Sequence, residues 1–239
     1  MMTNYLLLLL LAIITSAIPA DNITALTIQC DRDDYGIANH SSDFLPKLQH
    51  VHQLVLEECA LETIPDILSN ILLKVTKIKS LLLKGMKQHP IRSFPHHYQC
   101  SPVLKSVSRV KLVGTGGSES DDYSAVVGYL SQCTSVISLS ILSTSLACVM
   151  RLESGAALQS LRLTNNHIAE LQMEDFQALT KLRVLDLARN KLVRIPSRVF
   201  TNNRRLSRLC LARNIISFIT RQSFLGRIIH ISFVIPGMI

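Results

Sequence analysis

A leucine pattern returns every 24 residues near the carboxyl end of the sequence. Leu158-x-x-Leu161-x-Leu163-x-x-Asn166-x-Ile168 has the same spacing as the segments that start at Leu182 and at Leu206. Two later positions of the unit recur at the same interval of 24 residues. The first is occupied by Leu171, Ile195 and Ile219, and the second by Phe176, Phe200 and Phe224. Apolar residues that alternate over so short a segment indicate a strand, and a unit this small cannot bury its leucines alone. The pattern therefore predicts a solenoid of stacked coils.

Four less regular units precede these three, so that about seven repeats are expected over residues 51–229. Their expected strand positions are Val51, Leu54 and Leu56, then Ile78, Leu81 and Leu83, then Val107, Val110 and Leu112, and finally Thr134, Ile137, Leu139 and Leu142. A capping strand at Ile23, Leu26 and Ile28 is expected within residues 21–50. Residues 230–239 are expected to form an incomplete repeat or truncated end, with Phe233 and Ile235 at strand positions.

The repeat also predicts where each kind of side chain lies. The leucines of each L-x-L segment should point into the stack, and the residues between them should point outward on a parallel, concave sheet. The asparagines at the repeated position, Asn166, Asn190 and Asn214, form the Asn column, which should bond backbone groups of neighbouring coils. The three repeated phenylalanines form the Phe column, which should pack from the convex side. An amphipathic helix also repeats apolar residues, but the short unit with Asn at a fixed offset favours a strand. The expected fold is an α/β-type repeat solenoid with a mostly irregular or short-helical convex side.

The amino terminus predicts secretion. Leu6 to Ile14 is an apolar run of signal-peptide length, and the small residues that end at Ala20 suit signal peptidase, so residues 1–20 are assigned as a signal peptide. Glycosylation sequons follow at Asn22 and Asn39. These features predict an extracellular glycoprotein.

In an oxidising compartment the cysteines become candidates for disulfides. Cys59 falls in the Asn column and Cys30 at nearly the same offset of the capping strand, so a Cys30–Cys59 disulfide is expected. Cys100 and Cys133 lie late in their units, where they could bridge adjacent coils. Cys148 has no obvious partner, and Cys210 should point outward, either to form an intermolecular bond in a dimer or to stay unpaired.

Charge is concentrated in the regular repeats. Residues 158–239 contain thirteen Lys and Arg against four Asp and Glu, whereas the preceding residues are nearly balanced. The expected ligand-binding residues of the concave surface are Arg162, Arg189, Arg208 and Arg213. Arg forms bidentate contacts with carboxylate, sulfate or phosphate, so the surface fits a partner with acidic groups. A solvated basic face without a specific partner is the alternative.

Catalytic motifs are not found. His96-His97 has no further ligand at metal-binding spacing, Gly114 to Gly117 lacks the Lys of a phosphate loop, and Asp31 to Asp34 lacks the rest of a calcium loop. Solvated turns explain each motif more simply. We therefore expect no enzyme activity, no cofactor and no metal, and neither a nucleic-acid partner nor a membrane span.

The units around LRVLDLARNKLVRIPSRVF resemble the typical repeats of animal extracellular leucine-rich-repeat proteins, which include Toll-type receptor ectodomains, matrix proteoglycans and insect immune proteins of the mosquito type. The resemblance begins at about Val51 and implies a leucine-rich-repeat horseshoe. The single-Cys cap favours the insect immune group, which implies pattern recognition in innate immunity and complexes with complement-like proteins. The Cys-rich carboxyl-terminal cap and the coiled coil of such relatives are not found here. A matrix or cell-adhesion protein is the alternative.

Overall fold

A computed structural model of the chain describes residues 25–29, 51–59, 78–86, 102–114, 135–150, 152, 157–219, 221–224 and 230–232. The expected signal peptide, both sequons, and Cys30, Cys100 and Cys133 lie outside the described residues. The domain boundaries drawn from the sequence therefore stay predictions.

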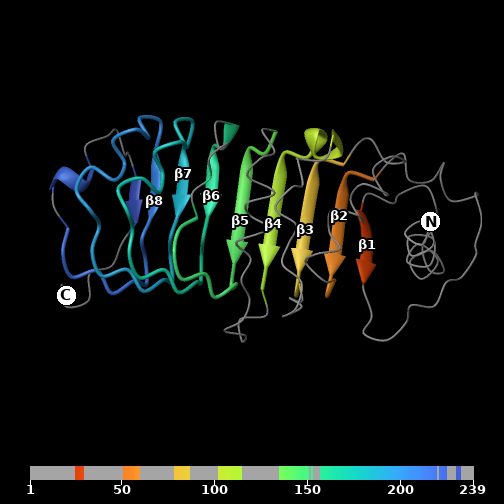
Figure 1. Cartoon of the computed structure of the whole chain (residues 1–239), viewed down its shortest axis with the longest axis horizontal. Coiled ribbons are helices and arrows are strands. Elements are labelled where there is room, and N and C mark those ends of the chain that lie inside the picture. The colour runs from red at the N-terminus through yellow and green to blue at the C-terminus, as the bar shows by residue number, and fades with distance from the viewer. Residues whose placement is uncertain are drawn as a thin grey trace, which may run out of the picture.

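The described residues contain one parallel sheet of nine strands, which follow one another in chain order. In Figure 1 the strands stand side by side in a single row, with their arrows pointing the same way. The strands are β1 (Ala25–Gln29), β2 (Gln53–Glu57), β3 (Ser80–Lys84), β4 (Arg109–Val113), β5 (Ser138–Leu142), β6 (Ser160–Arg162), β7 (Val184–Asp186), β8 (Arg208–Cys210) and β9 (His230–Ser232). This arrangement confirms the predicted solenoid of stacked coils.

The strands place the repeated leucines in register. Leu161 pairs with Leu185, and Leu185 pairs with Leu209, so that equivalent side chains form continuous rows through the core. All three are buried. Because neighbouring strands lie about 4.8 Å apart, each row is a stack of side chains in direct contact. Burial of apolar surface between coils is thus the main stabilising term.

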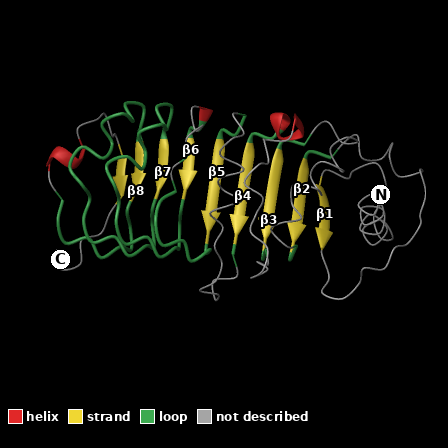
Figure 2. Cartoon of the chain, in the orientation of Figure 1, coloured by secondary structure: helices red, strands yellow, loops and turns green. Residues whose placement is uncertain are grey.

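Little of the described chain outside the strands is helical. The described helices are two 3-10 helices, η4 (Pro102–Ser106) and η6 (Arg221–Phe224), and Figure 2 shows loop over most of the remaining path in the regular repeats. On this side the rings of Phe176, Phe200 and Phe224 stack, with centroids 5.7 Å and 6.5 Å apart. The Phe column therefore closes the core opposite the sheet, as the sequence predicts.

The Asn column forms a ladder of side-chain hydrogen bonds between coils. Asn190 accepts a hydrogen bond from the Ile168 amide at 3.1 Å and donates to the carbonyl oxygens of Leu163 and Leu187 at 2.8 Å and 3.0 Å. Asn214 repeats the pattern with the Leu192 amide as donor. These buried backbone groups would otherwise be unpaired, which explains why Asn occupies the position.

In most coils, one residue of the turn that follows the strand has a positive φ. The residues are Glu58, Gly85, Ser143, Asn165, Arg189 and Arg213, with φ between 55° and 59°. Here the chain turns out of the sheet toward the ladder position. Gly114 follows β4 at the equivalent place, where a Cβ atom would collide with the carbonyl oxygen of Ser143. The glycine is therefore needed for coil packing.

The structure corrects the sequence prediction in two coils. In the coil of β5 the core positions are Val136, Leu139 and Ile141. Ile137 and Leu142 were expected inside, but Ile137 is 43% exposed and Leu142 is half-buried. Thr134 lies outside the described residues. Several apolar residues of the segment SVISLSIL, residues 135–142, fit the leucine spacing. The spacing alone therefore predicted the wrong core residues for this coil.

The ninth strand also differs from its prediction. Ile231 pairs with Leu209, so β9 lies two residues earlier than the 24-residue period places it. Phe233 and Ile235, the expected strand positions, lie outside the described residues. The last interval between strands is therefore shorter than those of the regular repeats.

Candidate ligand-binding surface

The side of the sheet that faces away from the core carries three rows of side chains, and we call it the outer face. Its middle row follows the strand pairing and consists of Thr27, Val55, Leu82, Lys111, Ser140, Arg162, Asp186, Cys210 and Ser232. A second row starts at Ala25 and runs to Arg208, and includes Arg109. The shorter third row includes Glu57, Lys84, Val113 and Leu142.

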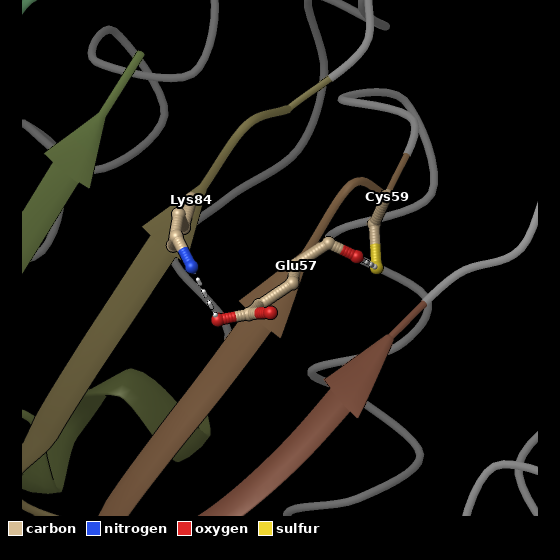
Figure 3. A network of polar contacts seen from close by, with 3 residues as sticks. All are labelled: Glu57, Cys59 and Lys84. Atoms are coloured by element: carbon tan, nitrogen blue, oxygen red, sulfur yellow. Dashed lines mark hydrogen bonds and ion pairs between the residues drawn. The ribbon is translucent and has the colours of Figure 1, made fainter. Parts of the chain in front are cut away.

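At the amino-terminal end of the outer face, opposite charges are paired. Lys84 Nζ lies 3.1 Å from Glu57 Oε1 across β2 and β3 (Figure 3). This exposed ion pair contributes at most about 1 kcal/mol to stability. Its consequence for binding is that Lys84 is neutralised, so this end of the face offers no free cation at that site.

From β4 to β8 the strands are basic. Their charged residues are Arg109, Lys111, Arg162, Asp186 and Arg208. The four cations are exposed, and none forms an ion pair with a described carboxylate. Asp186 instead uses Oδ1 to accept a hydrogen bond from the Ala188 amide at 3.0 Å. We call Arg109, Lys111, Arg162 and Arg208 the sheet cations.

The four arginines expected at the site occupy two kinds of position. Arg162 lies in β6 and Arg208 in β8, on the outer face. Arg189 and Arg213 lie beyond the ends of β7 and β8, in the left-handed turn that leads to the Asn ladder. All four are exposed. The sequence interpretation treated them as one surface, because spacing alone does not distinguish a strand residue from one in the following turn.

Arg109 and Lys111 were missed by the sequence interpretation. They alternate with the buried Val110 and Leu112 in β4, and the strand pairing places Lys111 two strands from Arg162 in the same row. The signal that could have found them is the V-x-L spacing of that coil, read for its outward residues. The interpretation considered outward residues only in the three regular repeats.

The described cysteines differ in state. Cys59 is disulfide-bonded and buried, and its partner lies outside the described residues because Cys148 and Cys210 are free. Its sulfur lies 3.5 Å from the Glu57 carbonyl oxygen (Figure 3), a contact without a hydrogen bond because a disulfide sulfur has no proton. Cys30 follows Gln29, the pairing partner of Glu57, so the Cys30–Cys59 bond stays a prediction that fits this register.

Cys210 is free and half-buried on the outer face, between Asp186 and Ser232 in the middle row. The disulfide-linked dimer through Cys210 stays a prediction, as does the bridge between Cys100 and Cys133. Within the described ranges no three His, Cys, Asp or Glu side chains gather as metal ligands. None of the described helices is long and apolar enough to cross a membrane.

Comparison with known proteins agrees with this geometry. The family profile described as leucine rich repeat matches residues 156–216 and 180–226, so the regular coils are similar in sequence to leucine-rich repeats. No curated protein sequence matches the chain significantly.

Solved structures show the same fold. The TLR13–ssRNA13 complex aligns over 80% of this chain with 15% identity and a TM-score of 0.53. The Toll–Spatzle complex of Drosophila, in its glycosylated form, aligns over 85% of this chain with 17% identity and a TM-score of 0.53. The chain spans 26% and 30% of the length of these two proteins. At such identities the similarity establishes the fold alone.

Proposed function

We propose that the protein is a secreted recognition module of innate immunity that binds the acidic surface of a partner protein through its outer face. The observation that carries the proposal is the set of sheet cations, which are exposed on three strands of the parallel sheet, β4, β6 and β8, without a carboxylate partner among the described residues. The strands fix the backbone positions of these cations, and such a surface attracts acidic partners over a long range.

A protein partner fits this face better than a nucleic acid does. Single-stranded nucleic acids are bound by basic surfaces that also carry aromatic side chains for base stacking. The outer-face residues of β2 to β8 include no aromatic residue. The half-buried Leu82, Val113 and Leu142 lie among the cations instead, a mixture typical of protein interfaces.

Secretion and an immune role are inferred from other features. The expected signal peptide and sequons support secretion, and leucine-rich repeats of similar fold occur in Toll and TLR13, both of which were solved as complexes with ligands. A complement-like protein of body fluid is the partner that the resemblance implies. The alternative is a matrix or adhesion protein that uses the same face.

The test measures binding to immobilised poly-L-glutamate and to single-stranded DNA at two salt concentrations. The double variant Arg162→Glu/Arg208→Glu should weaken poly-L-glutamate binding by about tenfold or more, because two attractive contacts become repulsive. The matched control Arg204→Glu/Arg205→Glu changes two exposed arginines that lie outside the strands. An equal loss in both variants, or tighter binding to DNA than to poly-L-glutamate, would contradict the proposal.

Fractionation distinguishes the two proposed classes of function. A recognition module should elute from secreting cultures in the soluble fraction and capture an acidic body-fluid protein in a salt-sensitive manner. A matrix protein should instead be retained on deposited collagen or proteoglycan. Retention that survives Arg162→Glu/Arg208→Glu would support the matrix alternative and contradict the role of the sheet cations.

A further inference from the structure

A second surface lies on the flank of the regular coils, next to the sheet and separate from the outer face. Its segments follow β6, β7 and β8 at the edge toward which the strand arrows point in Figure 1. The Lys191 amide donates to the Ile168 carbonyl at 2.9 Å, and the Ile215 amide donates to the Leu192 carbonyl at 3.1 Å. Arg194 and Phe218 form a parallel bridge. The flank is therefore held by backbone hydrogen bonds between coils.

Three large apolar side chains are exposed on this flank. Val193, Ile215 and Phe218 are 45%, 58% and 64% exposed, respectively. They lie on adjacent coils, because the Ser217 amide donates to the Val193 carbonyl at 3.0 Å and Phe218 pairs with Arg194. Single exposed apolar residues are common on protein surfaces, whereas a group on neighbouring coils is a candidate interaction site.

Cations surround this apolar group. Lys191 and Arg194 are exposed within it, and Arg189 and Arg213 lie in the turns just before it. Glu170 is the one acidic residue of the three flank segments 167–170, 191–194 and 215–218. It forms no ion pair with a described cation. We call Lys191, Val193, Arg194, Ile215 and Phe218 the flank patch.

Charge decides which occupant fits. A second copy of the chain would bring two sets of cations together in a symmetric contact, which is repulsive. A membrane surface favours apolar side chains that protrude on a loop or amphipathic helix, whereas Val193, Ile215 and Phe218 belong to segments held against the coil by backbone bonds. A polypeptide with carboxylates around one or two apolar side chains complements both features of the patch.

We propose that the flank patch binds a segment of a partner protein in which acidic residues flank apolar ones. Phe218 and Ile215 bury the apolar side chains of that segment, and Arg194 and Lys191 pair with its carboxylates. This site is independent of the sheet cations, so the two surfaces are able to hold two partners, or two parts of one partner.

The test uses fluorescein-labelled peptides and fluorescence anisotropy. The probe is Glu-Glu-Leu-Glu-Glu-Phe-Glu-Glu, and its two comparison peptides replace Leu and Phe by Ser, or every Glu by Gln. The probe should bind most tightly, and each comparison peptide should bind about tenfold more weakly or worse, because apolar and charged contacts both contribute. Equal binding of the Gln peptide, or of the Ser peptide, would overturn the proposal.

Variants locate the peptide on the molecule. Phe218→Ser and Arg194→Glu should each weaken probe binding by about fivefold or more. Met173→Ser, a matched change of an exposed apolar residue that lies outside the flank segments, should leave binding unchanged. Arg162→Glu/Arg208→Glu, the sheet variant, should weaken probe binding by a smaller factor than Phe218→Ser does, because the apolar contacts of the probe lie in the flank patch. Thermal unfolding of each variant checks the fold, which these exposed residues do not determine. Loss of probe binding in the sheet variant with retention in Phe218→Ser would overturn the site.

Two further measurements address the other occupants. Sedimentation of the protein without peptide should show no self-association that depends on Phe218. Cosedimentation with vesicles of phosphatidylcholine and phosphatidylserine should show no binding that Phe218→Ser removes. Phe218-dependent self-association would instead identify the patch as a dimer interface, and Phe218-dependent vesicle binding would identify it as a membrane contact; either result overturns the proposal.

Discussion

The left-handed residue after each strand connects the sheet to the Asn ladder. A residue with a Cβ atom costs about 1–2 kcal/mol in this conformation. Arg189 and Arg213 adopt it in successive coils, with φ of 56° and 57°, whereas Gly85 occupies the same place after β3. The two arginines are thus tolerated against a local preference for glycine.

Arg213→Gly should raise the stability of the protein. Glycine removes the steric cost of positive φ, and the gain after the added flexibility of the unfolded chain should be about 0.5–1 kcal/mol. Urea unfolding measures the change. Arg213→Ala keeps the Cβ atom and is the control, which should not raise stability. A midpoint for Arg213→Gly that is equal to or below that of Arg213→Ala would contradict the strain argument.

Asn190→Ala should lower the free energy of unfolding by about 3 kcal/mol, since one amide and two carbonyl groups lose buried hydrogen bonds. These groups are the Ile168 amide and the Leu163 and Leu187 carbonyls. Asn202→Ala, at an exposed residue of the same coil, is the control and should change stability by less than about 0.5 kcal/mol. Similar unfolding midpoints for the two variants would exclude a structural role for the ladder.

At the scale of single elements, sequence spacing predicted the regular strands because three features coincide in them. Leu185 and Leu187 define the alternation, Asn190 marks the exit from the strand, and Phe200 fixes the opposite side. In the coil of β5, Thr144 replaces the Asn, so the sequence no longer indicates where the strand ends. Neighbouring apolar residues then fit the leucine spacing equally well. The exposed Ile137 and buried Val136 were distinguished only by their pairing with the previous coil.

The candidate site was less predictable than the fold. Spacing predicted Arg162 and Arg208 on the outer face, since outward positions follow directly from alternation. It did not indicate the flank patch, because the exposed side chains there depend on how segments 191–194 and 215–218 pair after the turn. Solvent exposure of Phe218 is a property of the stacked coils and has no periodic signature.

The stacked rings make Phe200 the most sensitive member of the Phe column. Phe200→Ala should cost about 3–5 kcal/mol because it leaves a cavity and removes contacts with both Phe176 and Phe224. Phe224→Ala should cost less, since Phe224 is half-buried and stacks in the described chain on Phe200 alone. Calorimetry of the two variants measures the difference. A larger loss for Phe224→Ala would show that the column is stabilised from its end.

At the scale of the whole molecule, stability is transmitted between neighbouring coils. Each described strand pairs only with the strands before and after it in the chain. In such an array a local change weakens the adjacent coils and fades with distance. The disulfide of Cys59 therefore stabilises the amino-terminal coils, while the Asn ladder stabilises those of β6 to β8.

Cys59→Ser should increase hydrogen exchange in β2 and β3 by about tenfold or more, because the disulfide restricts the open states of that end. Exchange in β7 and β8 should change by less than about twofold, as expected for nearest-neighbour coupling. Cys148→Ser, which alters a free, exposed cysteine, is the control. Uniform acceleration across all strands would show instead that the chain unfolds as a single cooperative unit.

The equal spacing of Asn166, Asn190 and Asn214 makes the array extensible over evolutionary time. Each amide side chain contacts its own coil and the coil before it, so an in-frame duplication of one 24-residue unit creates a coil whose partners are already in place. Mutations at outward positions meet no such requirement. Gene duplication can then lengthen the scaffold while point mutation alters its surfaces, and new binding specificities arise without a new fold.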